Sequence, residues 1–292
     1  MLEKLKYPIS TGCFAEKPFR SIYYITRVII SDFFKLKINY KAIINKSKFF
    51  YNYKPYSKSG LGGRGQYILR EYYDKFFFIG QNILPQKFNF IDIGCSRGFF
   101  SLYLLGLQNF KGTGLCIDPL SKALQDFKEI LKLNKKSKIK LINGIISNKK
   151  KFNTKIYKVS KQGYYSIIKN ISFADKLPKG KKPESFLTKS YKLDNLVKTK
   201  KLISNIKFIK IDAEGAEYEI LLSAKKTIKE FKPIFYCEVT RKKKEIYNFL
   251  KKENYVLFYF NKKNLIRLRT NSFVGGELLA IHKNDNYFSK IQ

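Results

Sequence analysis

The stretch FNFIDIGCSRGFFS, residues 88–101, decides the fold of this 292-residue chain. It begins as a short apolar run that ends at Asp92, Ile93 and Gly94, and a longer apolar segment follows the second glycine, Gly98. An apolar run of this length bounded by glycines is typical of a buried parallel strand that leads into a crossover helix. At the carboxyl end of such a strand an open α/β sheet binds its ligands.

The spacing of Asp92, Gly94 and Gly98 predicts a ligand-binding loop. Gly94 lets the backbone turn sharply and approach a ligand, and Gly98 lets the helix begin close to the strand. Asp92 would repel a pyrophosphate and would favour a cationic ligand that carries an amino group and a sulfonium. Ser96 stands where the dinucleotide-binding fingerprint needs its second glycine, which disfavours that class. An ordinary tight turn between strand and helix is the alternative.

A second apolar run, residues 112–117, ends at Asp118 and Pro119. An acid at the end of the second strand of a βαβ unit is placed to hydrogen-bond the two ribose hydroxyls of an adenosine. Two acids after two consecutive strands therefore predict a nucleoside pocket. Its candidate binding residues are Asp92, Gly94, Ser96, Gly98 and Asp118.

The rest of the chain alternates helical and strand patterns before it ends in strands alone. The expected elements are helix 121–134, strand 138–146, strand 206–211, helix 216–231, strand 234–239, helix 242–252 and strands 255–260, 265–268 and 277–281. This order predicts a mostly parallel sheet with right-handed crossovers, closed at one edge by antiparallel strands. Residues 147–190 are the least periodic region, and an insertion of that length is usually functional or partly disordered.

The strand at 206–211 runs into a second polar cluster, formed by Lys210, Asp212, Glu214 and Glu217. Ionisable side chains at the end of a buried strand are costly unless they pair with one another or bind a ligand. A structural role is also open for Glu217, because acids in the first turn of a helix favour the helix dipole.

The net charge of +37, from 59 basic and 22 acidic residues, suggests contact with polyanions. Only eight of the basic residues are arginine, although arginine is the side chain expected for bidentate contacts with phosphates and bases. We therefore expect strong nonspecific binding of nucleic acid at low salt, with nucleic acid possible but not favoured as the physiological partner.

The cysteines are isolated and the single histidine is His282, which we expect on the surface or at a strand end. This composition fits a reducing, cytoplasmic compartment and leaves little basis for a zinc ribbon or for a histidine-ligated metal, so no metal site is predicted. No apolar stretch reaches the roughly 18 residues of a spanning helix.

The first 65 residues are predicted to form a basic, amphipathic extension. Residues 21–34 and 35–48 predict one or two amphipathic helices that pack on the main domain, and the alternative is an arm that lies peripherally on an anionic membrane. The glycine-rich stretch 57–65 predicts a hinge, and residues 66–78 predict a helix that leads into the first strand.

These motifs together resemble the FkbM-type methyltransferase family over residues 86–281. The segments that carry the resemblance are DIGCSRGFFS from Asp92, IDP at 117–119, Asn134, YKLDNL at 191–196, KIDAEGAEYEIL from Lys210 and KPIFYCEV at 232–239. The resemblance implies a Rossmann-like class I fold that binds S-adenosylmethionine, with a seven-stranded, mostly parallel sheet whose last strand is antiparallel. The chain then divides into the extension, 1–65, and a methyltransferase domain, 66–292.

The resemblance also implies site roles. The cofactor's amino-acid portion would lie at residues 92–98 and its ribose at Asp118, with Lys210, Asp212 and Glu214 as catalytic candidates beside the methyl-transfer centre. Because the motifs contain no histidine, Asp212 or Glu214 would accept the proton of the acceptor hydroxyl, and Lys210 would stabilise the carboxylates or the developing alkoxide. Alternatively, Asp212 only holds the cofactor and Glu214 only caps the following helix.

The sequence departs from the family at Cys95, Ser96 and Arg97, which stand where the family loop usually has alanine and asparagine. Arg97 adds a cation near a cationic ligand. The implied reaction is O-methylation of a hydroxyl on a sugar, glycan or small-molecule natural product. The alternatives are ribose methylation of RNA, motivated by the lysine surplus, and a noncatalytic binding protein on the same fold.

Overall fold

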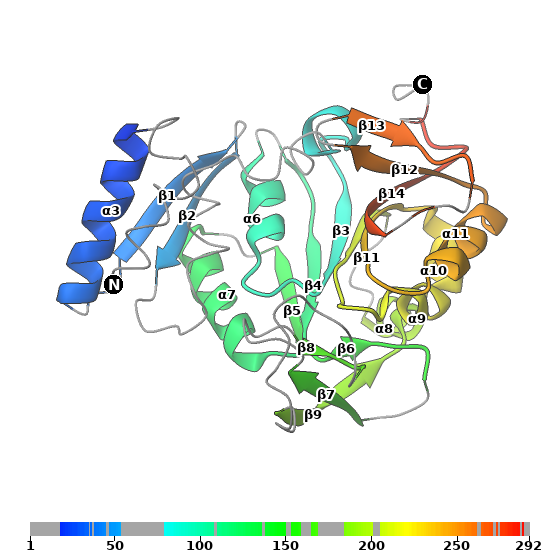
Figure 1. Ribbon diagram of the computed structural model, residues 1–292, viewed down its shortest axis with the longest axis horizontal. Coiled ribbons are helices and arrows are strands. Elements are labelled where there is room, and N and C mark those ends of the chain that lie inside the picture. Colours follow the sequence, from blue (N-terminus) through cyan, green and yellow to red (C-terminus); the bar gives the residue numbers. More distant parts are fainter. Residues whose placement is uncertain are drawn as a thin grey trace.

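The computed structural model describes residues 18–34, 36, 38–44, 47–53, 79–107, 110–135, 138–149, 153–158, 165–168, 184–200, 205–261, 264–270, 273, 275–286 and 288. Its centre is an eight-stranded sheet (Figure 1). In spatial order the strands are β13 (Asn264–Arg267), β12 (Tyr255–Asn261), β14 (Gly276–His282), β11 (Ile234–Val239), β10 (Ile206–Ile211), β3 (Asn89–Ile93), β4 (Gly114–Asp118) and β5 (Ile139–Asn143).

The sheet has the predicted direction of strands. β5, β4, β3, β10 and β11 pair in parallel, whereas β14 is antiparallel to both of its neighbours, β11 and β12. The predicted fold class is therefore confirmed. The strand count implied by the resemblance is low by one, because β13 folds back antiparallel on β12 and extends the edge.

Two apolar layers sandwich this sheet. One contains α6 (Phe99–Gly106) and α7 (Ser121–Leu133), and the other contains α8 (Leu193–Lys200), α9 (Glu217–Leu222), α10 (Lys225–Phe231) and α11 (Lys243–Lys252). Successive strand residues serve opposite layers, as Phe90 and Ile91 do in β3. Parallel strands covered on both faces need such continuous apolar runs.

A smaller sheet lies near the carboxyl ends of the parallel strands of the large one. Its order is β6 (Ile145–Ile146), β9 (Ser185–Tyr191), β7 (Asn153–Lys158) and β8 (Tyr165–Ser166). The irregular insertion expected over residues 147–190 therefore contains β7, β8 and most of β9. β9 does alternate, but Thr188 is its most buried side chain, so no apolar period marks it. The predicted strand 138–146 is also interrupted at Gly144, where the chain leaves one sheet for the other.

The predicted helix 216–231 is divided into α9 and α10 by hydrogen bonds from α8. The backbone N–H of Asp194 donates to the carbonyl oxygen of Ser223 at 3.1 Å, and the Asp194 carboxylate accepts the backbone N–H groups of Lys226 and Thr227 at 3.0 and 2.8 Å. A side chain from α8 therefore caps α10. Local periodicity cannot show such a partner.

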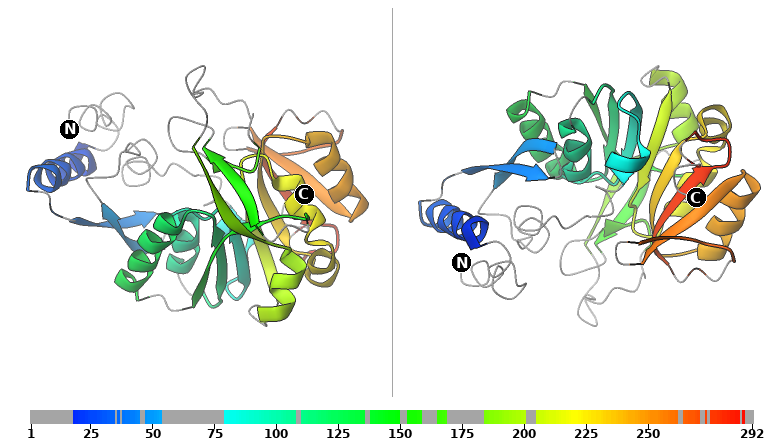
Figure 2. Two further views of the ribbon diagram at one scale, coloured as in Figure 1. Left: turned by 90° about the horizontal axis from the view of Figure 1, so that it is seen from below. Right: turned by 90° about the horizontal axis from the view of Figure 1, so that it is seen from above.

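The N-terminal extension holds one helix, α3 (Pro18–Phe33), and a hairpin of β1 (Ile38–Ile44) and β2 (Ser47–Tyr53). The second helix expected over 35–48 is wrong, because INYKAII and SKFFYNY are rich in the β-branched and aromatic residues that favour strands. β2 lies against α6 and α7, and α3 lies farther out, at the end of the molecule (Figures 1 and 2). The predicted hinge 57–65 and helix 66–78 fall outside the described residues. Before β3 the chain forms a short π-helix, η1 (Ile79–Ile83). No described helix is long and apolar enough to cross a membrane.

Candidate active site

Acidic residues meet at the carboxyl ends of the parallel strands. Asp118 ends β4, Asp92 lies one residue before the end of β3, Asp212 follows β10 and Glu238 lies one residue before the end of β11. Glu277 of the antiparallel β14 lies directly opposite Glu238. Adjacent strands therefore bring five carboxylates together at the carboxyl ends of the parallel strands. We call this end of the sheet the acidic edge.

Backbone hydrogen bonds between loops hold this edge together. The N–H groups of Gly94 and Cys95 donate to the carbonyl oxygen of Ile117 at 2.9 and 3.2 Å, and the N–H of Asp212 donates to that of Ile93 at 3.0 Å. The loop after β3 is thus fixed to the ends of β4 and β10 before any ligand binds. Such preorganisation is what a ligand site on an open sheet requires.

Both predicted loop glycines are required by close packing. Gly94 has a φ of 76°, and a Cβ atom there would lie 1.7 Å from the carbonyl oxygen of Asp212. Gly98 has a φ of 73°, and its Cβ would lie 2.0 Å from the ring of Phe127 in α7. Gly94 therefore allows two loops of the site to touch, whereas Gly98 allows α6 to pack against α7.

Asp92 and Lys210 form the buried base of the site. Ser101 Oγ donates to Asp92 Oδ2 at 2.6 Å, and Lys210 Nζ lies 3.5 Å from Asp92 Oδ1 and 3.1 Å from Asp212 Oδ2. Burial raises the pKa of Asp92, and Lys210 opposes that rise. Burial would lower the pKa of Lys210, but Asp212 and Asp92 outweigh it and raise that pKa, so Lys210 stays protonated.

Asp118 links the first two strand ends. Its Oδ2 accepts the backbone N–H of Ser96 and its Oδ1 that of Leu120, both at 2.8 Å. Burial nevertheless raises the pKa of Asp118 to about 6. Asn143, which our sequence reasoning missed, donates from Nδ2 to the carbonyl oxygens of Asp118 and Pro119 at 3.1 and 3.0 Å and so fixes this turn. The sequence does contain a signal for Asn143, because a polar residue followed by a glycine ends the third apolar run.

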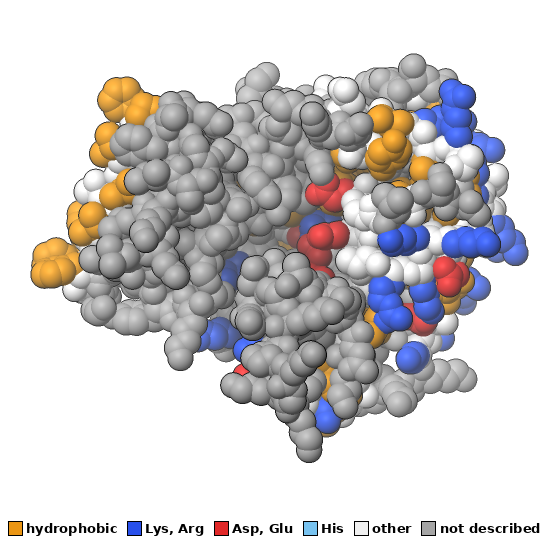
Figure 3. Space-filling view, in the orientation of Figure 1, with side chains coloured by type: hydrophobic (Ala, Val, Ile, Leu, Met, Phe, Trp, Pro, Cys, Tyr) orange, Lys and Arg blue, Asp and Glu red, His pale blue; other side chains and the backbone are white. Residues whose placement is uncertain are grey.

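Carboxylates are crowded on the β10 side of the site. Burial, with the charges of Asp212 and Glu238, raises the pKa of Glu214 to about 8. Burial raises that of Glu217 to about 7, although Glu217 Oε1 accepts the N–H of Gly215 at 2.7 Å. Asp212, followed by burial, raises that of Glu238 to about 7. A group of acidic side chains is visible near the middle of the face in Figure 3.

Glu238 and Glu277 were also missed at the sequence level. Glu238 ends an apolar run in the same way as Asp118, which is a usable signal. Its position opposite Glu277 depends on the register between β11 and β14, which the sequence does not display. Arg97 is oriented differently from the expectation, because its Nε lies 2.9 Å from Asp126 Oδ2 of α7, which offsets the cation.

Two cavities adjoin at this edge. The smaller, about 200 Å³, is lined by Gly94, Ser96, Asp118, Asp212 and Glu214 among others, and the β8 residues Tyr165 and Ser166 complete its wall. Ser166 Oγ donates to the carbonyl oxygen of Glu214 at 2.7 Å, which docks the small sheet on the site. Asp92, Gly98 and Lys210 are buried and do not line this cavity.

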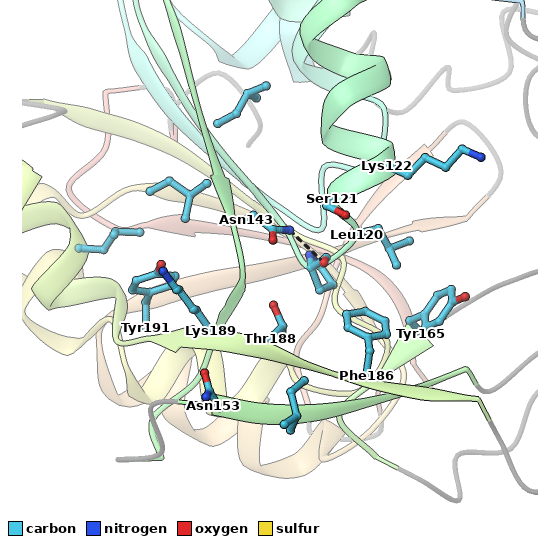
Figure 4. A pocket seen from close by; sticks show the side chains of 15 residues that line it. Leu120, Ser121, Lys122, Asn143, Asn153, Tyr165, Phe186, Thr188, Lys189 and Tyr191 are labelled. Atoms are coloured by element: carbon cyan, nitrogen blue, oxygen red, sulfur yellow. Dashed lines mark hydrogen bonds between the residues drawn. The ribbon is translucent and has the colours of Figure 1, made fainter.

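The larger cavity, about 890 Å³, lies between the start of α7 and β9. Thr188 and Phe186 of β9 point across it toward Asn143 and Leu120 (Figure 4). Pro119, Leu120 and Tyr165 line both cavities, so the larger one adjoins the Asp118 end of the smaller. Sequence reasoning missed it because its lower wall comes from the unrecognised strands β7, β8 and β9.

The family model "Methyltransferase FkbM domain" matches residues 92–257, more than half of the chain. The chain belongs to the FkbM methyltransferase family. This confirms the resemblance read from the motifs, since the matched region begins at Asp92 and contains the Lys210–Glu217 block. A comparison with curated proteins finds no match.

Solved structures similar to this FkbM chain are distant in sequence. An FkbM methyltransferase from Methylobacillus flagellatus KT is 17% identical with a TM-score of 0.44, and the alignment covers 69% of this chain but only 46% of that one. M. capricolum TrmK in complex with S-adenosylhomocysteine is 15% identical (TM-score 0.38, 72% and 68% covered). An O-methyltransferase from Bacillus cereus, also with S-adenosylhomocysteine, is 12% identical (TM-score 0.37, 67% and 74% covered).

The acidic edge fits S-adenosylmethionine, the methyl donor that the family resemblance implies. The donor carries a sulfonium and an ammonium, and Lys210 is the one cation among the charged groups buried beside these carboxylates in the described part of the chain. The charge of Asp212 raises the pKa of Glu238 and adds to the effect of burial on Glu214, so these carboxylates repel one another and a further positive charge would offset the repulsion. Among the described residues, no three His, Cys, Asp or Glu side chains are grouped so as to hold a metal ion.

Proposed function

We propose that this FkbM methyltransferase acts on an uncharged hydroxyl of a sugar, glycan or small-molecule natural product. The observation that carries the proposal is the contrast between the acidic edge and a chain of net charge +37. Only 22 residues of the sequence are acidic, yet five of them lie together where the parallel strands end. A phosphodiester backbone would be repelled from such an edge, whereas a neutral hydroxyl would not.

The cofactor would be held by the loops after β3 and β4. Gly94 and Ser96 offer a close backbone approach, and Asp118 would accept the ribose hydroxyls through the lone pairs that its two backbone partners leave open. Asp92, buried behind the loop, contributes negative charge that favours the donor's cationic portion. When bound, S-adenosylmethionine supplies an electrophilic methyl group on a sulfonium.

Glu214 is the proton acceptor in this proposal, and Asp212 and Lys210 position it. Asp212 and Glu214 both line the smaller cavity, and Lys210 already engages Asp212 Oδ2. Glu214 has a φ of 49°, a left-handed conformation that a non-glycine residue adopts at a cost of about 1–3 kcal/mol, and the Ser166 hydrogen bond to its carbonyl helps to hold it there. With a pKa of about 8 it is largely protonated at neutral pH, and a neighbouring cation would ionise it.

RNA ribose is the second candidate acceptor, favoured by the lysine-rich surface. Nonspecific attraction to phosphates weakens steeply with salt, whereas productive recognition of a specific RNA survives moderate salt. The two acceptor classes can therefore be separated in one assay.

The test begins with calorimetric titration of S-adenosylmethionine and S-adenosylhomocysteine into the wild type, Asp118→Ala and Glu214→Gln. Glu230→Gln is the matched control, because Glu230 is an exposed acid on α10. We expect Asp118→Ala to lose at least tenfold in affinity and Glu214→Gln to bind the cofactor but to lose methyl transfer to hydroxyl acceptors by about 100-fold. No cofactor binding by the folded wild type would contradict the proposed enzyme, and salt-resistant transfer to RNA would replace the acceptor class.

A further inference from the structure

The apolar stripe of α3 is exposed to solvent along its length. Phe19, Ile22, Tyr23, Ile29, Ile30 and Phe33 recur at helical spacing, and their exposed fractions run from 38% for Ile30 to 87% for Phe19. Phe34 and Leu36 continue the stripe beyond the helix with exposed fractions of 62% and 52%. In Figure 3 these apolar side chains stand out along the edge of the molecule where α3 lies.

This exposure is concentrated in one place. Among the described residues, every strongly exposed large apolar side chain lies between Phe19 and Leu36, except Leu187 of β9. Scattered apolar residues on a surface need no explanation, but a continuous apolar face usually marks an interaction site. The expectation that the extension packs on the main domain applies to β2, which contacts α6 and α7, and not to this stripe.

The charge of the same arm indicates what covers the stripe. Residues 18–53 contain seven lysines or arginines and one aspartate. A second copy of the chain would bring two such arms, each on a chain of net charge +37, into contact, which like-charge repulsion opposes. An anionic surface would instead attract the basic residues while the stripe leaves water.

We propose that α3 is an interfacial helix that docks this protein on an anionic lipid bilayer. At 16 residues it lies in the plane of the headgroups and does not span the membrane. The guanidinium carbon of Arg27 lies 4.7 Å from the centroid of the Tyr23 ring, which places a cation beside the stripe's aromatic residue. An amphipathic aromatic ring with an adjacent cation is suited to the boundary between acyl chains and headgroups.

The test is co-sedimentation with vesicles of pure phosphatidylcholine and of phosphatidylcholine with about 30% phosphatidylserine, a composition that mimics an anionic leaflet. We compare the wild type with the double variant Phe19→Ser/Phe33→Ser. The matched control is Leu187→Ser, which removes an apolar side chain of 68% exposure outside the stripe. Circular dichroism checks that the variants fold, which the exposure of both phenylalanines predicts.

We expect the wild type and Leu187→Ser to bind the anionic vesicles, and the double variant to lose at least tenfold in partitioning. Net charge is the same in all three proteins, so equal binding by the double variant would show attraction by charge alone and would overturn the proposal. Absence of wild-type binding would also overturn it. So would sedimentation velocity that finds a wild-type dimer and a monomeric double variant, because the stripe would then be a contact between copies.

Discussion

The acidic edge and the α3 arm, residues 18–53, both place side chains in an unfavourable environment, but they do so in opposite ways. The acidic edge buries charge, and its loops are fixed to one another by backbone hydrogen bonds, by Lys210 and by Ser101. The α3 arm exposes apolar side chains and is rich in basic residues. Each arrangement is unfavourable for an isolated protein, and each would be relieved by a different ligand, a cation in the first case and an anionic surface in the second. The difference teaches that the position of the charges, and not the net charge, indicates the chemistry.

The largest expected effect comes from forcing the loops of the acidic edge apart. Gly94→Ala would place a Cβ atom against the carbonyl oxygen of Asp212 in a left-handed backbone conformation. We expect cofactor affinity to fall by about 100-fold or more, since strain of about 3 kcal/mol corresponds to that factor. Calorimetry with S-adenosylmethionine measures it.

Gly276→Ala is the control for that substitution, because Gly276 has a φ of 98° and a Cβ atom added there would meet no atom within 4 Å. It also places a side chain at a positive φ, but without the collision. Equal losses of affinity in the two variants would show that loop contact at Gly94 is not what organises the site.

The next effect is on stability. Lys210→Met leaves Asp92 and Asp212 without their shared cation, and removal of one partner of a buried ion pair costs about 3–5 kcal/mol of unfolding free energy. Lys158→Met, which removes a partly exposed ion pair with Glu184, should cost at most about 1 kcal/mol. Urea unfolding followed by circular dichroism compares the two, and similar losses would contradict a structural role for Lys210.

Stability should also depend on pH. The pKa values of Glu214, about 8, and of Glu217 and Glu238, about 7, lie above the ordinary glutamate value of 4.5. The folded state therefore binds more protons than the unfolded state in this window, and these groups lower the free energy of unfolding as pH rises from about 4.5 to 8.

Glu214→Gln should remove part of this fall in the free energy of unfolding with rising pH. Relative to the wild type, the variant should gain stability between about pH 5 and pH 8 in urea titrations, while Glu230→Gln should stay parallel to the wild type. A difference from the wild type that is independent of pH would show that folding does not raise the pKa of Glu214.

Much of the fold and part of the site could be predicted from the sequence. The apolar runs predicted the strands of the large sheet, because parallel strands covered on both faces need continuous hydrophobic residues. Gly94 and the acids at 92, 118 and 212 were predicted because they lie at or just after the end of such a run, and Gly98 because it directly precedes one. The family was predicted from the same blocks and is confirmed by the match over residues 92–257.

Other features depend on partners that are distant in the sequence. Thr188, Asn143 and Glu277 acquire their positions from strand registers, and the break between α9 and α10 comes from Asp194. The hairpin at 38–53 was misread because its basic residues obscure the alternation typical of strands.

The sequence by itself determined which segments are buried, where the chain turns and which chemical groups end each strand, because these follow from local periodicity and residue type. Only the tertiary structure decided that the carboxylates share one edge, that Lys210 lies beneath them and that the α3 stripe faces outward. Those outcomes depend on how strands align and helices dock, and the energies that fix them arise between residues far apart in the chain.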